Sequence, residues 1–380
     1  MARPRYNEPQ PVWRNIMIPI VQWTGLGGLF VALAVLLAGE VRPPTVLGNR
    51  ESRAAATARE GAYSLKALHD RLPPDAIELI QRNIKYFQTT GRRRLVDGLA
   101  RGGRYLETYR RIFRERGMPE ELAYLPLIES GFVETAVSPA QAVGMWQFIE
   151  ETGRRYNLNR SDWSDKRLDP FQSAAAAANL LKHLYDAFQD WELALAAYNA
   201  GAGTIRWAVR VNHKAGLPTN FWALELPDET RNYVPTFLAA VLIAKNPPAY
   251  GFGEIRFHPE LAYDHIKVSP GISLDFLAEE GGISSKALYE LNPALIRGTI
   301  PPGDKPYLLR VPVGTRNDLP VRLTGVKTSP RDWVLYRVQF TDTVESLATR
   351  FRANPTSILK ANRLVDEEEL LLRNFVIIPL

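Results

Sequence analysis

The sequence predicts an α+β protein of several domains, in which one apolar N-terminal helix precedes an all-helical region and two small β-α-α-β modules. Three observations predict this arrangement. An uncharged apolar run lies near the N-terminus, apolar residues recur at helical spacing from 61 to 245, and the pattern after 264 occurs twice. The length of 380 residues suits two or three domains, and 46% hydrophobic residues suffice for buried cores.

The first predicted element is a membrane anchor. The run from Ile16 to Ala38 has 23 residues and no charge, and about 20 residues span a bilayer as a helix. Three arginines precede it, which predicts a cytoplasmic N-terminus and a protein body on the other side of the membrane. The alternative is a cleaved signal peptide, although the apolar part of such a peptide is shorter, about 7–15 residues.

A strongly basic segment follows a spacer. Residues 91–116 contain nine arginines and three acidic residues, a surplus as large as the net charge of +6 of the whole chain. Such a segment could contact an anionic lipid or wall polymer, or it could simply be the solvated face of a helix. Because the predicted anchor exports the body of the protein, we expect no nucleic acid partner.

Helical patterns dominate the middle of the chain. Ile77, Ile80 and Ile84 share one helix face within a basic lead-in. Proline and acidic residues begin a helix at 119, and alanine-rich residues 172–188 form another. Asp190 and Asp228 are typical helix caps, so we expect helices at 190–199 and 229–245.

The C-terminal part contains a tandem repeat. Four positions of the first unit recur 70 residues later in the second. They are Val268, Leu274, Leu288 and Asn292, which match Val338, Val344, Ile358 and Asn362. Each unit predicts a strand, two helices and a strand. A core of about 45 residues is thin, so these modules suit binding better than catalysis.

The composition excludes several kinds of site. The chain has no cysteine, which excludes disulfides, thiolate ligands, cysteine nucleophiles and a lipid on an N-terminal cysteine. Its five histidines are scattered without paired spacing, so no metal site is predicted. We therefore expect neither a metal nor an organic cofactor.

The best candidate for acid–base chemistry is Glu129. It ends an apolar run, and a carboxyl at the end of a buried helix is poorly solvated, so its pKa should rise toward that of a general acid. Alone, it could equally be an exposed helix end. Residues 144–148 (Gly-Met-Trp-Gln-Phe) and 197–201 (Ala-Tyr-Asn-Ala-Gly) add apolar faces and amides, which suit the two sides of a sugar ring.

Taken together and in this order, these segments resemble the motifs of lytic murein transglycosylases, with Glu129-Ser130 as the catalytic pair. Residues 168–170, 191–195 and 221–235 are similar to the branch called membrane-bound lytic murein transglycosylase D. The C-terminal repeat resembles LysM modules, with a degenerate first copy in which Pro270 begins the altered turn.

The resemblance implies a lysozyme-like catalytic fold and cleavage of the β-1,4 bond between N-acetylmuramic acid and N-acetylglucosamine. Glu129 would act alone as acid and then base, with assistance from the substrate, and would leave a 1,6-anhydro end. The implied substrate-binding residues are Ser138, Met145, Gln147, Tyr198, Asn199 and Tyr233. The implied glycan-binding residues of the second module are Asp342, Thr343 and Asn362. Peptidoglycan glycan strands would be the partner.

We expect the N-terminal part to consist of cytoplasmic residues 1–15, a transmembrane anchor at 16–39, a spacer at 40–60 and a basic helical lead-in at 61–114. The rest is expected to consist of a catalytic domain at 115–246, a degenerate LysM-like module at 264–313, a linker at 314–333 and a LysM module at 334–380. This places a single-pass protein in the bacterial inner membrane with its catalytic domain on the periplasmic side. A lysozyme-like hydrolase and a non-catalytic, peptidoglycan-binding scaffold are the alternatives.

Overall fold

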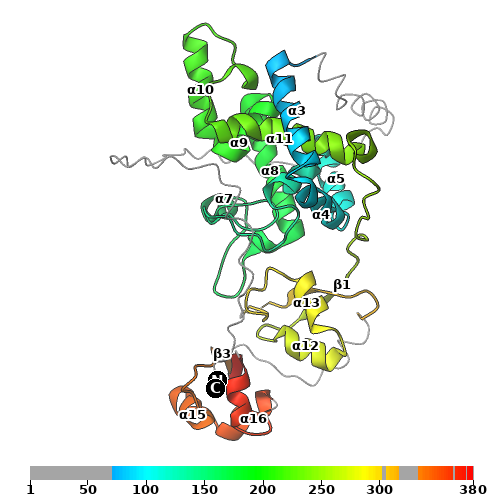
Figure 1. Cartoon of the computed structure of the whole chain (residues 1–380). Coiled ribbons are helices and arrows are strands. Elements are labelled where there is room, and N and C mark those ends of the chain that lie inside the picture. The colour runs from blue at the N-terminus through cyan, green and yellow to red at the C-terminus, as the bar shows by residue number, and fades with distance from the viewer. Residues whose placement is uncertain (1–70, 302–304, 316–332, 363, 374, 380) are drawn as a thin grey trace, which may run out of the picture. The chain divides into compact units, whose positions relative to one another are not determined.

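The computed structural model describes residues 71–301, 305–315, 333–362, 364–373 and 375–379 (Figure 1). The predicted cytoplasmic end, anchor and spacer, residues 1–60, lie outside these ranges. Within them, no helix combines the length and apolar character that a membrane crossing needs. The prediction of an anchor at 16–39 therefore stays a prediction.

The described chain begins with three amphipathic helices, α3 (Pro74–Gln88), α4 (Arg92–Gly102) and α5 (Leu106–Arg114). Ile77, Ile80 and Ile84 are buried, as their spacing predicted. In Figure 1, α3 runs beside α11 (Asp228–Lys245), the last long helix of this region.

Two central helices begin at aspartate caps. Asp169 accepts hydrogen bonds from the first amides of α8 (Pro170–Phe188), and Asp190 does the same for α9 (Trp191–Ala200). The cap predicted at Asp228 is wrong. There α11 begins one residue earlier, Pro227 takes the capping position, and Asp228 is the first helical residue.

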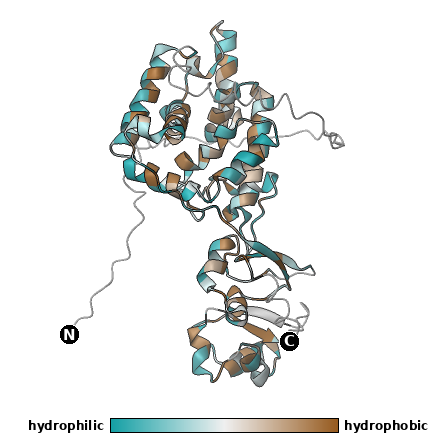
Figure 2. Ribbon diagram, turned by 90° about the vertical axis from the view of Figure 1, so that its right-hand side faces the viewer, coloured by the Kyte–Doolittle hydropathy of each residue, from teal (hydrophilic) through white to brown (hydrophobic). Residues whose placement is uncertain are grey.

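Short elements connect the long helices. They are η3 (Glu120–Tyr124), α6 (Leu125–Glu129), α7 (Glu150–Arg155), η4 (Lys166–Leu168), α10 (Ala202–Lys214), η5 (Phe221–Ala223) and η6 (Pro247–Tyr250). The helix predicted after Pro119 thus begins as a 3-10 turn before it becomes α6. The long helices and most of the short elements share one hydrophobic core, whose largest fully buried side chain is Trp146. Figure 2 shows apolar and polar residues on different faces of the same helices.

The two C-terminal modules have the predicted strand–helix–helix–strand order. The first contains β1 (Asp264–Val268), α12 (Leu274–Gly281), α13 (Ser285–Leu291) and β2 (Tyr307–Val311). The second contains β3 (Trp333–Arg337), α15 (Val344–Phe351), α16 (Pro355–Asn362), the unpredicted turn η7 (Glu368–Leu372) and β4 (Phe375–Pro379). In each module the two strands pair antiparallel, and each module has a core of its own.

Candidate active site

Glu129 is the last residue of α6 and lies next to helix α4. Gly98 of α4 permits this approach, because a Cβ there would lie 2.7 Å from Leu127 Cδ1. Two arginines of α4 hold the chain on either side of Glu129. Arg94 Nη2 donates to the carbonyl of Ile128 (3.2 Å), and Arg101 Nε donates to that of Gly131 (2.8 Å). The basic lead-in thus fixes the backbone that presents Glu129.

The carboxyl of Glu129 meets the phenol of Tyr233. The Tyr233 hydroxyl donates a hydrogen bond to Glu129 Oε1 from helix α11. Burial raises the pKa of Glu129 to about 7, opposed by this hydrogen bond, while Glu229 raises it further and Arg94 lowers it. A carboxyl with a pKa near 7 holds and releases a proton at neutral pH, as a general acid and base must.

A tight loop, residues 136–148, carries the second predicted motif. Isolated bridges pair Val143 with Val137 and with Phe148. Gly144 has φ +83°, and a Cβ there would lie 2.1 Å from the carbonyl oxygen of Arg167, so only glycine fits. Gln147 has φ +48°, which is uncommon for a residue other than glycine and often marks a functional site.

The amide of Gln147 is held by its own loop. Its Nε2 donates to the carbonyl of Gly144 (2.7 Å) and, more weakly, to that of Ala136 (3.4 Å). Because both bonds use Nε2, the side-chain oxygen Oε1 of Gln147 remains to accept a hydrogen bond from a ligand. At the other end of the loop, Ser138 Oγ accepts from the Ala142 amide (3.0 Å), which leaves its hydroxyl proton for another acceptor.

Two hydroxyls fasten this loop beside Glu129. Ser130 Oγ donates to the carbonyl of Met145 (2.9 Å), and the Tyr198 hydroxyl donates to that of Trp146 (2.6 Å). The motifs at 129–130, 144–148 and 197–199 therefore meet in space. Gln147 follows directly after the two carbonyls that are held.

Asn199 is oriented from helix α11. The Thr230 hydroxyl, buried at 3% exposure, donates to Asn199 Oδ1 (3.0 Å). This bond directs the amide so that Nδ2 remains to donate elsewhere. Thr230 lies one turn before Tyr233 on the same helix, so α11 supplies contacts to both Asn199 and Glu129.

Six of the predicted site residues are half-buried, which is what side chains need to be both fixed and accessible. They are Glu129, Ser138, Gln147, Tyr198, Asn199 and Tyr233. Met145 is the exception, because its side chain is 1% exposed and its Sδ accepts from the Tyr109 hydroxyl (3.1 Å). The prediction that the Met145 side chain contacts substrate does not fit this burial. Met145 contributes to the site through its backbone carbonyl, which accepts the hydrogen bond from Ser130.

Sequence reasoning missed three residues of this site, Arg94, Arg101 and Thr230. The two arginines were visible only as members of a charge cluster. A usable signal for Thr230 was its place three residues before Tyr233, which puts both on one helix face.

The three residues predicted to bind glycan in the second module all have internal partners. Asp342, 5% exposed, accepts from the Gln339 amide, and Thr343 caps α15. Asn362 donates to the carbonyls of Ile358 and Ile377 and accepts from the Ile377 amide. Their roles toward sugar stay predictions. Across the described ranges, no three or more His, Asp or Glu side chains gather as a metal site would require.

Comparison with known proteins agrees with these features. Residues 111–217 match the model of the transglycosylase SLT domain, 262–327 that of the LysM-like domain of lytic transglycosylase MltD, and 336–379 that of the LysM domain.

Individual proteins match as well. The chain is 33% identical over 263 residues to the membrane-bound lytic murein transglycosylase D of two Escherichia coli strains, an alignment that covers 66% of this chain and 58% of the relative. The chain thus spans less than two thirds of the length of these relatives. It is also 38% identical over 103 residues to an Alteromonas protein named for tributyltin chloride resistance, covering 27% of this chain and 50% of that one.

Among solved structures, an inactive mutant of the lytic transglycosylase Slt from Pseudomonas aeruginosa matches with a TM-score of 0.29 and 19% identity. This match covers 55% of the present chain and 31% of the other.

Proposed function

The chain contains a domain of the transglycosylase SLT family followed by two LysM-type modules, and from this premise we propose that it is a peptidoglycan lytic transglycosylase with Glu129 as its acid and base. The observation that carries the proposal is the carboxyl of Glu129, whose pKa is raised to about 7 and which meets Tyr233. The similarity to lytic murein transglycosylase D supports the substrate class.

The proposed reaction cleaves the β-1,4 bond between N-acetylmuramic acid and N-acetylglucosamine. Protonated Glu129 gives its proton to the glycosidic oxygen, which leaves as the 4-hydroxyl of N-acetylglucosamine. The 2-acetamido oxygen of the muramic acid stabilises the electron-poor C1. Glu129, now a carboxylate, removes the proton of the muramic O6 hydroxyl, and O6 bonds to C1. The products are a 1,6-anhydromuramic end and a regenerated Glu129.

The arrangement of carboxyls favours substrate assistance. Glycosidases with two catalytic carboxyls place them across the scissile bond. The neighbouring Glu134 instead accepts a hydrogen bond from the Tyr105 hydroxyl. Glu229 is an exposed residue that acts on Glu129 through its charge. Neither is fixed beside Glu129 as a nucleophile would be.

The amides and hydroxyls around Glu129 would hold the sugar. Gln147 offers an acceptor for the N–H of an N-acetyl group, and Asn199 offers a donor for its carbonyl. Ser138 can donate to a sugar oxygen, while Tyr198 acts by holding the loop and Tyr233 by holding Glu129. The hydrogen bonds that each side chain already makes support these proposed roles.

The proposed location is the cell envelope, with residues 16–39 as an inner-membrane anchor and the catalytic domain on the periplasmic side. Peptidoglycan glycan strands are the proposed partner of the catalytic domain and of the second module. The exposed arginines of 91–116 could add a contact with anionic lipid or wall polymer, although Arg94 and Arg101 also support the active site.

The variant Glu129→Gln tests the proposal. Gln keeps the shape but carries no transferable proton, so turnover of purified peptidoglycan should fall on the order of 10³-fold. Binding to insoluble peptidoglycan should survive. The matched control is Glu134→Gln, which changes a nearby carboxyl in the same way and should retain most activity. Unchanged turnover in Glu129→Gln would exclude Glu129 as the acid.

A further inference from the structure

We propose that the first LysM-like module, residues 262–301 and 305–315, is a positioning part of the active site, and that Arg310 is the residue through which it acts. The module fixes the segment 165–169, and the loop that carries Gln147 rests on this segment. The inference builds on the proposed function, since it concerns the same site.

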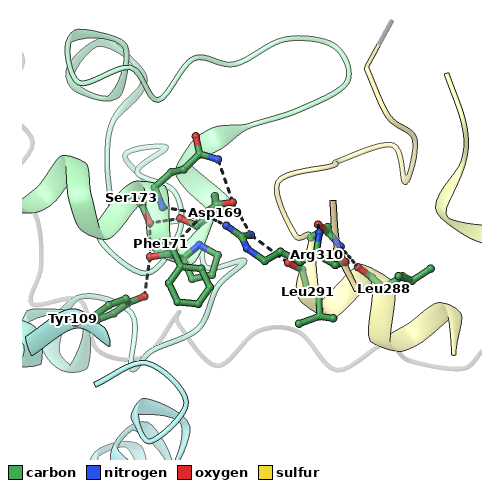
Figure 3. A network of polar contacts seen from close by, with 10 residues as sticks. Tyr109, Asp169, Phe171, Ser173, Leu288, Leu291 and Arg310 are labelled. Atoms are coloured by element: carbon green, nitrogen blue, oxygen red, sulfur yellow. Dashed lines mark hydrogen bonds and ion pairs between the residues drawn. The ribbon is translucent and has the colours of Figure 1, made fainter. Parts of the chain in front are cut away.

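The contact centres on a buried ion pair between the module and the catalytic domain. Arg310 of β2 pairs with both oxygens of Asp169, with Nη1 at 2.8 Å from Oδ2 and Nη2 at 3.1 Å from Oδ1 (Figure 3). The two side chains are 12% and 3% exposed. The guanidinium also stacks between Phe171 of α8 and Tyr263 of the module, 4.9 and 5.4 Å from their ring centres. Bidentate, stacked contacts of this kind are specific to arginine.

Asp169 is already part of the catalytic domain's framework. Its Oδ1 accepts from the amides of Phe171 and Gln172 and so caps α8. Next to it, the Tyr109 hydroxyl donates to the carbonyl of Pro170 (Figure 3). Arg310 thus binds a carboxylate whose position the core of the domain has fixed, and the pair ties β2 directly to the start of a central helix.

The module also holds the other end of the segment. The amide of Asp165 donates to the carbonyl of Ala294 (2.9 Å), and Arg297 lies 5.0 Å above the ring of Trp163. The first module therefore contacts segment 165–169 at both of its ends.

The middle of this segment supports the active-site loop. Arg167, 3% exposed, forms a buried bidentate pair with Asp165 and donates to the carbonyls of Phe148 (3.2 Å) and Gln141 (3.4 Å). The backbone of Gly144 packs on the carbonyl of Arg167, at the point where no Cβ would fit. A shift of segment 165–169 would therefore move the loop on both sides of Gln147.

Within the module, Arg310 occupies the one strand position that an asparagine clamps. Asn292 accepts from the Arg310 amide and donates to its carbonyl. In the second module Asn362 clamps Ile377 in the same way. The strand registers agree. Arg310 pairs with His265, and Ile377 pairs with Leu335, the residue 70 positions after His265. The two modules thus share a scaffold, and the docking side chain is present only in the first.

The test replaces Arg310 by the residue of the second module. In Arg310→Ile the full-length protein should cleave purified peptidoglycan with a kcat lowered about tenfold and a KM changed less than twofold, because the loop is misplaced while glycan binding persists. Hydrogen exchange of amides in 141–148 should increase. Arg310→Lys keeps the charge but loses the two-pronged contact, so it should be intermediate.

The matched control is Lys267→Ile, which removes an exposed positive charge from the partner strand β1 and should change neither readout. Unchanged kcat and unchanged exchange in Arg310→Ile would overturn the positioning role, and so would equal losses in Lys267→Ile. Failure of the proposed function would look different. The wild-type protein would then release no 1,6-anhydro ends, while exchange at 141–148 would still report on the coupling.

Discussion

The two C-terminal modules are built on the same plan but relate differently to the rest of the chain. Both have antiparallel outer strands, two helices and an asparagine clamp. At the clamped position, Arg310 of the first module pairs with the catalytic domain, whereas the second module has Ile377. Modules with the same fold can thus differ in how they contact the rest of the chain, through a side chain such as Arg310 that lies outside the shared scaffold.

The ion pairs of the two modules also differ, in their exposure and in their geometry. The Arg310–Asp169 pair is bidentate, with side chains 12% and 3% exposed. In the second module, Arg350 is 54% exposed and lies 3.8 Å from Asp342, whose side chain is 3% exposed. A pair in which both partners are buried is costly to break because it leaves an unpaired charge, whereas a longer pair with an exposed arginine is partly screened by water.

The largest expected effect on stability comes from the asparagine clamps. Asn292→Ala and Asn362→Ala each leave backbone groups of a strand without partners, and each should lower the free energy of unfolding of its own module by about 3 kcal/mol. Calorimetric thermal melts of the two variants measure the loss of unfolding free energy in each module. Only Asn292→Ala should also lower turnover, because only its strand carries Arg310. Equal losses of turnover in both variants would contradict the distinction between the modules.

The pH dependence of stability that Glu129 causes should appear in the catalytic region alone. The folded pKa of Glu129 is raised from 4.5 to about 7, so the protonated carboxyl favours the folded state below about pH 4.5, and this contribution is lost as pH rises through 7. Relative to wild type, Glu129→Gln should therefore gain about 3 kcal/mol of unfolding free energy between pH 4 and pH 8.

Urea unfolding of both proteins at several pH values checks this expectation. The transition of the second module should not respond to the substitution. A constant difference between the two proteins at all pH values would mean that the pKa of Glu129 is not raised. Activity should follow the same group, with kcat/KM of the wild type falling above about pH 7 as the acid loses its proton.

The smallest effect is expected for the exposed arginine of the second module's ion pair, Arg350. Arg350→Gln should lower the unfolding free energy of the second module by less than about 1 kcal/mol. Arg310→Gln, the same substitution at the buried pair, should cost several times more and should lower turnover. Chemical unfolding of both variants measures the two losses of unfolding free energy. Similar losses in Arg350→Gln and Arg310→Gln would contradict the difference that the burial of the two arginines predicts.

Much of the fold was predictable because it depends on local patterns. The buried face of α3, the cap at Asp190 and the strand–helix–helix–strand order of the modules follow from periodicity, capping and the repeat. The cap predicted at Asp228 is wrong, because Pro227 already has the extended backbone that a capping position requires.

The site was predictable in its motifs but not in its supports. Glu129, Gln147 and Tyr198 stand in segments that are informative when they are taken together and in order. Arg94 and Arg310 act through carbonyls and carboxylates far away in the sequence, and no local pattern indicates such contacts. Met145 shows the converse, since a residue inside a motif can serve the core rather than the substrate.

The central claim is that Glu129 drives an intramolecular transfer rather than hydrolysis. Mass spectrometry of the glycan fragments released from purified peptidoglycan tests it most directly. We expect muramic ends that are lighter by one water than those of a hydrolytic digest, formed by the wild-type protein and absent with Glu129→Gln. Ends that carry the full water of hydrolysis would contradict it and would identify a lysozyme-like hydrolase.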